Sequence, residues 1–588
     1  MQKLKVLLIL LVISGSFAYS DNKSIVAQSA NRVIDVLEGK SFERHVTPYM
    51  IDIARNGHLL SEENKNRLKS LGFDFSGNLV ILLRPSLDYY YDTEHFRIHY
   101  DLTGYHAVNN IDSNGDGIPD YIETMASVFE EVYNHEINIL DYTIPPGDGT
   151  DGGGSNLFDI YVQSTNAYGW TNYGALTGDN PNSTDITENN AYLSYMIMRN
   201  NYIGFPNTEL ENIQVTAGHE FFHAIQLGYD GDEELWLMES TAVWMEEETY
   251  DEVNDCYQYM IPWFDEPHIK LNHNTYRLQR YGSYIFFKYI DEHLGGKDII
   301  RKTWEQSILF DSNDGDYSIQ SIDLALKSNN HTFKKALNNM ALANVIFSPE
   351  DNTGQYAYEE AIGYQNYREF SGYDNDSLAI VLGILDSLNF NKGNSKYIDS
   401  GDIKYDRSLQ LQQYGSQYIK INATDPVKVS MNTQGLTLHT VVKSNSGNYE
   451  VQSGPVLNIN PGSNSDWIYA VVVADNNNVQ DFNYKISFAD GIQNSYTDFT
   501  ILGQFPNPFN NSITVKLKVI TPQNIDLEVY DMLGRKITTI FSGYLPNGNH
   551  EYLWNGANAN NEKVSSGVYY ITAMSDNRQE WKKITLIK

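Results

Sequence analysis

The hydrophobic pattern of the chain changes near residue 395, and this change constrains the fold more than any other feature. Before it, stretches such as 121–140 and 211–226 place apolar residues at helical spacing. After it, short alternating stretches separated by Asn, Gly, Ser and Asp clusters predict strands at the spacing of a β-sandwich. A chain of 588 residues is too long for one compact core, and its length predicts roughly four domains. We therefore expect separate modules.

The first 20 residues are typical of a secretory signal peptide. Lys3 and Lys5 precede an apolar run over 4–13, and small residues follow it. The run is too short to span a bilayer comfortably, and no other stretch approaches 18 apolar residues. We therefore expect an exported chain without a transmembrane span once the signal is removed. A buried N-terminal strand is the alternative interpretation.

The cysteine count and the net charge of the chain argue against several classes of protein. Cys256 is the single cysteine, so neither an internal disulfide nor a cysteine-based zinc site is available. The charge sum, 41 basic against 75 acidic residues, gives a net charge of −34. Such a polyanion repels phosphate backbones, which argues against a nucleic-acid partner. Surface acids do suit divalent cations, calcium above all.

Residues 219–223 form an HExxH motif, which predicts a metal site. On a helix, His219 and His223 lie on one face one turn apart, so both imidazoles can reach one zinc ion. Glu220 points about 100° away, where it can serve as the general base toward a zinc-activated water. A chance match in a helix without metal is the alternative, and the motif alone does not exclude it.

A third ligand must come from another element. Gln226 and Tyr229 hold the places where a Gly and a third His would continue the motif in one large class of zinc proteases. Glu239 lies 16 residues beyond His223 on an apolar, aromatic helix face, where a carboxylate is costly unless it is paired or bound to metal. The three residues together predict a His₂Glu metal site that leaves one coordination position open. Alternatively, Glu239 caps or pairs within its own helix.

Further residues could complete this site. Glu246 could accept a hydrogen bond from a ligand histidine, or be a solvated charge beside Glu247. Three downstream side chains are candidates to donate to an oxyanion: His268, His273 and the preferred Tyr281. A structural role is the first interpretation of each.

Residues 112–123 match the calcium-loop pattern D-x-[DN]-x-[DN]-G-x5-E at every required position. Gly117 allows the sharp turn, whereas Pro119 removes a donor that paired calcium loops use. We therefore predict a solitary, structural Ca²⁺ site, with an acidic turn without metal as the alternative. Its expected ligands are Asp112, Asn114, Asp116, Ile118 through its carbonyl, Asp120 and Glu123.

Four motifs in the first half of the chain resemble a bacterial family of secreted metalloproteases with a gluzincin-like site. They are HFRIHYDLTGYHAV, DSNGDGIPDYIE, VTAGHEFFHAIQLGYD and WLMESTAVWMEEE, and the likeness covers about 80–345. The resemblance implies a zincin-like core with zinc on His219, His223 and Glu239 and with Glu220 as base. Val243 departs from the pattern, because an Asp often follows the third ligand there.

The tail resembles the C-terminal sorting domain of the type IX secretion system over about 498–588. The matching stretches are FPNPFNNSITVKLKV, DLEVYDMLGRKI, SSGVYYI and KKITLIK. The resemblance implies export across the outer membrane, with the secretion machinery as partner and a secreted or cell-surface location. An accessory binding sandwich is the alternative.

These expectations combine into a multidomain α+β protein, in which a zincin-like core precedes two all-β sandwich modules. The expected segments are a signal peptide (1–20), an N-terminal segment and candidate pro-region (21–90), the peptidase domain (91–350), a helical or irregular connection (351–394), a β-sandwich (395–497) and the sorting domain (498–588). The expected function is a zinc metalloendopeptidase acting on proteins or peptides, with Zn²⁺ and Ca²⁺ as cofactors and Glu220 and Tyr281 as catalytic residues. The alternative is a non-catalytic surface protein, in which the zincin scaffold is retained and the middle sandwich binds.

Overall fold

The computed structural model describes most of the chain and divides it into two compact units, 1–490 and 491–588. The described residues are 22–149, 151–274, 278–351, 354–364, 384–389, 396–399, 410–431, 435–461, 465–476, 481–482, 484–491, 499–519, 522–532, 534–575 and 578–588. The expected signal peptide, and 365–383 of the expected connection, lie outside these residues. None of the described helices combines the length and hydropathy that a membrane crossing needs.

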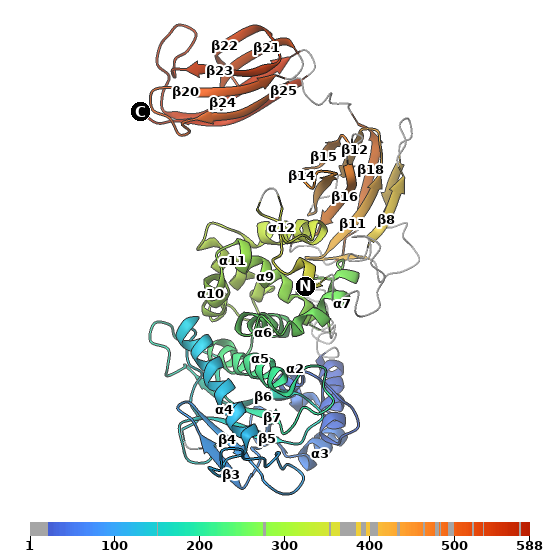
Figure 1. Cartoon of the computed structure of the whole chain (residues 1–588), viewed down its shortest axis with the longest axis vertical. Coiled ribbons are helices and arrows are strands. Elements are labelled where there is room, and N and C mark those ends of the chain that lie inside the picture. Colours follow the sequence, from blue (N-terminus) through green and yellow to red (C-terminus); the bar gives the residue numbers. More distant parts are fainter. Residues whose placement is uncertain are drawn as a thin grey trace, which may run out of the picture. The chain divides into compact units, whose positions relative to one another are not determined.

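A five-stranded sheet carries the first part of unit one (Figure 1). Its order is β3 (Tyr89–Asp92), β4 (Phe96–Tyr100), β5 (Phe158–Gln163), β7 (Ala191–Arg199) and β6 (Gly169–Gly178). The central strands β4, β5 and β7 are parallel, and β3 and β6 run antiparallel at the two edges. Ile160 of β5 pairs with Ile98 and Met196, which places β5 at the centre of the sheet.

Both faces of this sheet are covered, as a largely parallel sheet requires. On one face, Ile160 and Val162 share a hydrophobic cluster with α4 (Asp120–Tyr133) and α5 (Glu209–Asp230). On the other face, Tyr161 and Trp170 share a cluster with the N-terminal segment. That segment comprises helical residues 22–37, α2 (Thr47–Asn56), the 3-10 turn Gly57–Leu59, α3 (Glu62–Ser70) and the short hairpin β1 (Phe73–Asp74) with β2 (Ile81–Leu82).

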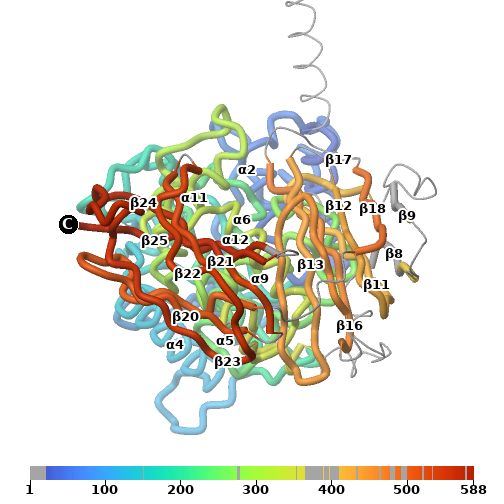
Figure 2. Tube along the Cα trace, turned by 90° about the horizontal axis from the view of Figure 1, so that it is seen from above, coloured from blue at the N-terminus to red at the C-terminus, as the bar shows by residue number. Residues whose placement is uncertain are grey.

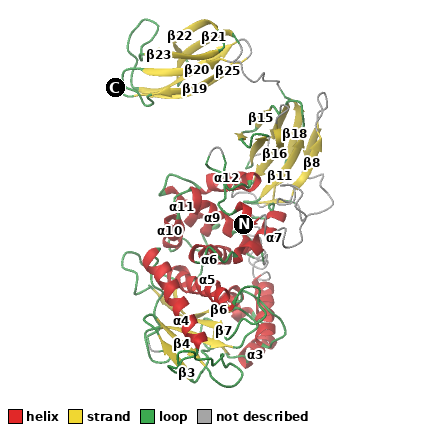
Figure 3. Cartoon of the chain, in the orientation of Figure 1, coloured by secondary structure: helices red, strands yellow, loops and turns green. Residues whose placement is uncertain are grey.

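A mostly helical layer follows the sheet (Figure 3). Its elements are α6 (Leu235–Thr249), α7 (Met260–Asp265), α8 (Gln279–Gly282), α9 (Tyr284–His293), α10 (Lys297–Ser307), α11 (Tyr317–Lys327) and α12 (Phe333–Ile346). The helical stretch predicted at 211–226 is confirmed as part of α5. Helix α5 is buried on nearly every side beyond its first turn, because it lies between the sheet and this layer.

The rest of unit one is a β-sandwich. One sheet has the order β14 (Tyr449–Ser453), β13 (Thr437–Ser444), β16 (Ser465–Val473), β11 (Ser416–Asn422) and β8 (Ile384–Asn389). The other has the order β15 (Val456–Ile459), β12 (Val427–Met431), β18 (Lys485–Asp490) and β9 (Lys396–Asp399). The sandwich docks on α12, where Tyr418 donates to the Ala341 carbonyl at 3.1 Å and His439 Nε2 lies 2.6 Å from Asn338 Oδ1.

Unit two is a second all-β module with its own hydrophobic core. One sheet joins β19 (Phe499–Phe505), β20 (Ile513–Val519) and β23 (Gly548–Trp554). The other joins β22 (Lys536–Leu545), β21 (Gln523–Asp531), β24 (Gly567–Ser575) and β25 (Arg578–Leu586), which Figure 2 shows side by side. The chain is therefore a mixed α/β protein with several β-sheets toward its C-terminus, as the sequence predicts.

Candidate metal centre

Helix α5 brings two histidines together in the interior. Its N-terminus is fixed by a capping box, in which Thr208 and Glu211 exchange side-chain to backbone hydrogen bonds. His219 and His223 are one turn apart and almost completely buried, and their Nε2 atoms are 3.0 Å apart. Two imidazole nitrogens this close need a shared proton or a cation between them.

Helix α6 returns beside α5 and supplies a carboxylate to the same point. Glu239 is fully buried, and its two oxygens lie 3.5 Å from His219 Nε2 and 3.4 Å from His223 Nε2. Within the described chain neither oxygen makes a hydrogen bond. Burial alone would raise the pKa of Glu239, but the two imidazoles hold that pKa well below its usual value. A carboxylate left in this state fits a cation bound by all three residues.

The outer nitrogen of each imidazole has a fixed partner. His219 Nδ1 lies 2.5 Å from Glu246 Oε1, and His223 Nδ1 lies 2.7 Å from Gln226 Oε1. Gln226 is itself held, because its amide nitrogen donates to the Met238 carbonyl at 2.9 Å. These bonds orient both Nε2 atoms inward, as the outer partners of metal-binding histidines do. Glu246 is buried, so the interpretation of a solvated surface charge is wrong.

The carboxylates favour a positive charge at the centre. Burial lowers the pKa of His219, but Glu239 and Glu246 outweigh it and raise that pKa to about 10. A divalent cation would supply the same positive charge without a proton. His219, His223 and Glu239 are also one of the groups among the described residues whose ligand atoms all lie within 4.8 Å of one another.

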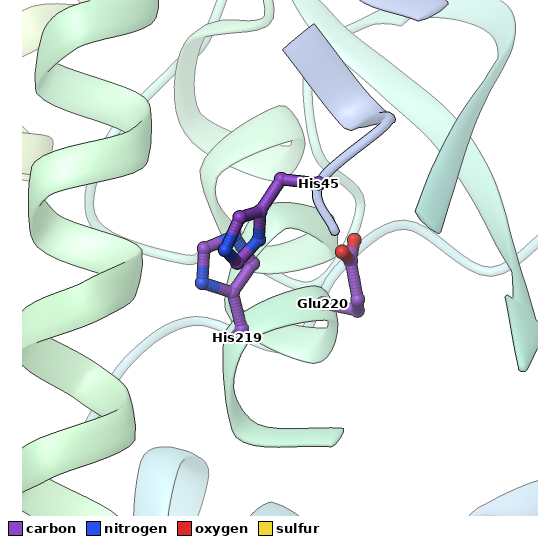
Figure 4. A group of neighbouring side chains, drawn as sticks. All are labelled: His45, His219 and Glu220. Atoms are coloured by element: carbon purple, nitrogen blue, oxygen red, sulfur yellow. The ribbon is translucent and has the colours of Figure 1, made fainter. Parts of the chain in front are cut away.

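Glu220 is buried one residue from His219 but turns toward the sheet. Its Oε2 accepts a hydrogen bond from Thr47 Oγ1 at 2.8 Å, and Thr171 Oγ1 of β6 lies 2.9 Å away. One carboxylate oxygen remains within 4.8 Å of a ring nitrogen of His219 (Figure 4). The carboxylate is thus beside the centre, as the helix geometry predicts, and is held by two hydroxyl groups.

Tyr281, in α8 of the helical layer, lies next to the centre. Its ring stacks on His45 at 4.6 Å and on Tyr259 at 5.2 Å. Burial, followed by the charge of Glu239, raises its pKa well above the usual value, so the hydroxyl keeps its proton. His268 and His273 are buried in the segment before α8, where the His268 carbonyl accepts from Gln412 at 2.9 Å.

The structure adds two residues to this region that the sequence analysis did not single out. His45, from the N-terminal segment, packs on His219 with ring centroids 4.6 Å apart. Its Nε2 forms a short hydrogen bond with the hydroxyl of Tyr259. Neither residue carries a motif or a periodic pattern, and His45 is 174 positions from His219, so no sequence signal pointed to them.

The expected calcium loop is exposed and lies directly before α4, with Glu123 in the first turn of that helix. Asp112 accepts from the backbone N–H groups of Gly115 at 2.7 Å and Gly117 at 2.9 Å. Asp120 is engaged by Ser113, whose hydroxyl donates to it at 2.6 Å. In the described chain, no three acidic groups of this loop bring ligand atoms within 4.8 Å of one another.

Comparison with known families gives two matches. Residues 186–502 match the model of a family of unknown function, DUF6055. Residues 504–588 match the secretion system C-terminal sorting domain, which confirms the predicted tail. The chain is therefore exported, to the cell surface or the surroundings. No curated protein matches it.

Solved structures show only partial likeness. PorZ, a surface component of the type IX secretion system of Porphyromonas gingivalis, is 15% identical with a TM-score of 0.12, over 18% of this chain and 14% of its own. Dimeric latent PorU from Porphyromonas gingivalis is 17% identical with a TM-score of 0.16, over 28% and 18%. A DUF4785 family protein of Legionella pneumophila is 10% identical with a TM-score of 0.14, over 33% and 59%. The chain thus covers less than two thirds of each, and such scores carry no argument about its activity.

Proposed function

Because the chain belongs to DUF6055, a family of unknown function, we propose its function from the chemistry of the metal centre. We propose that it is an exported, zinc-dependent peptidase that hydrolyses protein or peptide substrates. One observation carries the proposal: Glu239 is fully buried and makes no hydrogen bond within the described residues, yet both its oxygens face imidazole nitrogens at 3.4–3.5 Å.

In this proposal His219, His223 and Glu239 hold the zinc ion, which leaves one position for a further ligand. When bound, zinc lowers the pKa of a water and polarises a peptide carbonyl. Glu220 accepts the proton of the attacking water and passes it to the leaving amine. Glu246 keeps its carboxylate on His219 Nδ1, so the ring cannot rotate away from the centre.

The 112–123 loop has a separate role in the proposal. We propose that it binds one Ca²⁺, which would draw Asp112, Asn114, Asp116, the Ile118 carbonyl, Asp120 and Glu123 together. Asn114 already donates to Glu123 at 3.0 Å, so the two ends of the loop are in contact. The ion would then fix the start of α4, which shares one hydrophobic cluster with the sheet and α5.

Metal analysis tests the centre before any activity is measured. We expect one zinc per wild-type chain and its loss in His223→Ala and in Glu239→Ala. His58→Ala is the matched control, because His58 is an exposed histidine in the same unit. One zinc retained in both ligand variants would refute the assignment.

Casein cleavage tests the chemistry. Glu220→Gln should keep the zinc and lose the hydrolysis that the wild type or an activated form shows, because the amide accepts no proton. Hydrolysis that persists in purified Glu220→Gln would remove Glu220 from the role of base. Zinc without cleavage in any form would favour the non-catalytic surface protein.

A further inference from the structure

Residues 43–47, which we call the strap, lie along the free edge of the sheet. Strand β6 is an edge strand, paired with β7 on one side among the described strands. On its other side, His45 forms a parallel bridge with Gly169, the first residue of β6, and Glu43 donates its backbone N–H to the carbonyl of Asn166, three residues before the strand, at 3.1 Å. The strap thus occupies the place where another extended segment could pair with β6.

The first functional contact of the strap is His45. Its ring lies between His219 and Tyr281, at 4.6 Å from each ring centroid, and is nearly parallel to Tyr281. One of its ring nitrogens lies within 4.8 Å of the ligand atoms of His219 and Glu220. Figure 4 shows the three side chains around one point. His45 therefore covers one side of the centre, next to His219 and Glu220.

The second contact is Thr47, which engages the proposed base. Its hydroxyl donates to Glu220 Oε2 at 2.8 Å and accepts the backbone N–H of Thr171 in β6 at 3.0 Å. Because Thr171 also donates to Oε2, this oxygen is directed at the sheet and is not available to a water at the centre. One side chain therefore ties the base to the edge strand.

The strap walls a cavity beside His219 and Glu220 that is too small for a peptide. The cavity beside His219 and Glu220 measures about 10 Å³ and is walled by Arg44 and His45, together with Tyr168 and Glu246 among others. This volume suits about one water molecule. Arg44 anchors the wall, since it forms an ion pair with Asp255 and lies 4.2 Å over the ring of Tyr168.

We propose that the strap is an internal inhibitor that keeps the metal centre closed, and that its displacement opens a groove along β6 for an extended peptide. The inference rests on the proposed function, whose site it regulates. It also names the substrate class, because a free sheet edge binds an extended chain through backbone hydrogen bonds. The peptide would then take the edge that residues 43–47 now hold.

The test uses the full chain with His45→Ala and Thr47→Val combined. We expect zinc to pass to a chelator faster than from the wild type, on the order of tenfold, because the centre opens to solvent more often. His58→Ala, an exposed histidine of the same segment, should exchange at the wild-type rate. An unchanged rate in the double variant would overturn the proposal, as would a slower one.

A second variant guards against a folding defect. Asp255→Asn is close to isosteric and weakens the anchor of Arg44 without entering the cavity. It should speed zinc transfer in the same direction as the double variant. If both variants keep the wild-type circular dichroism and neither exchanges faster, the strap does not close the site.

A measurement on metal-free protein separates this inference from the proposed function. Diethyl pyrocarbonate acylates accessible imidazoles, and mass spectrometry locates the modified residue. We expect the imidazoles of the centre, His219 and His223, to react faster in the double variant than in the wild type when both proteins are treated at the same pH. Faster acylation without zinc binding or casein cleavage would keep the strap as a cover and refute the peptidase. Equal acylation would refute the strap whatever the metal analysis gives.

Discussion

The bond between His219 and Glu246 gives the sharpest prediction. Glu246 is 3% exposed, and its Oε1 lies 2.5 Å from His219 Nδ1. Glu246→Gln keeps the length of the side chain and an acceptor oxygen but removes the charge. Replacing such outer partners typically costs about 10–100-fold in metal affinity. At about 1.4 kcal/mol for each tenfold change, the variant should lose about 1.4–2.8 kcal/mol of zinc binding.

Competition with a chromophoric chelator at neutral pH measures this loss. Stoichiometry should stay at one zinc, because all three proposed ligands remain. Glu248→Gln is the control: Glu248 lies on the same helix but pairs with His135 and Lys297 away from the centre. If Glu246→Gln binds zinc within about twofold of the wild type, or if Glu248→Gln loses as much, the orienting role is refuted.

Three further predictions concern stability. Burial lowers the pKa of His439 to about 4, so the neutral side chain stabilises the fold fully above about pH 6.5, and this stabilisation is lost as the pH falls toward 4. The midpoint of thermal unfolding should therefore fall less between pH 6.5 and 4 in His439→Gln than in the wild type. Equal falls in the two proteins would contradict this prediction. A Cβ at Gly231 would lie 2.2 Å from Tyr192 Cδ2, so Gly231→Ala should lose about 1–3 kcal/mol in urea unfolding, whereas Gly147→Ala, with its nearest contact at 3.9 Å, should not. Calcium at about 100 times its dissociation constant should stabilise the wild type by about 2.7 kcal/mol but not Glu123→Gln, and equal thermal shifts would place the ion elsewhere.

The parts of the site that the sequence predicts depend on local geometry. The spacing of His219 and His223 fixes their common face once 211–226 is a helix, and α5 is that helix. Glu239 was singled out because a charge on an apolar helix face needs a partner, and it lies beside both imidazoles. The β modules could be predicted equally well, because the alternation of apolar and polar residues in a strand depends only on residues that are neighbours in the sequence.

The strap was not predictable, because its position depends on pairing between distant segments. His45 reaches His219 only after β6 has become the edge of the sheet and the segment before α2 has paired with it. Neither step leaves a periodic pattern around residue 45. The sequence analysis gave 21–90 as a candidate pro-region, and the structure places a histidine of that segment beside the centre.

The cluster that joins the N-terminal segment to the sheet bears on how the site could be opened. Side chains such as Val33, Ile34 and Ile53 are fully buried against Trp170 and Ile197. Each contributes roughly 1.5–3 kcal/mol by its burial, so the segment holds to the sheet without its covalent link. A single proteolytic cleavage after α3 would leave the N-terminal segment bound to the sheet as a noncovalent subunit. Under the proposed function, opening the centre to solvent would require that segment to be digested or to be pulled from the sheet by an unfolding force.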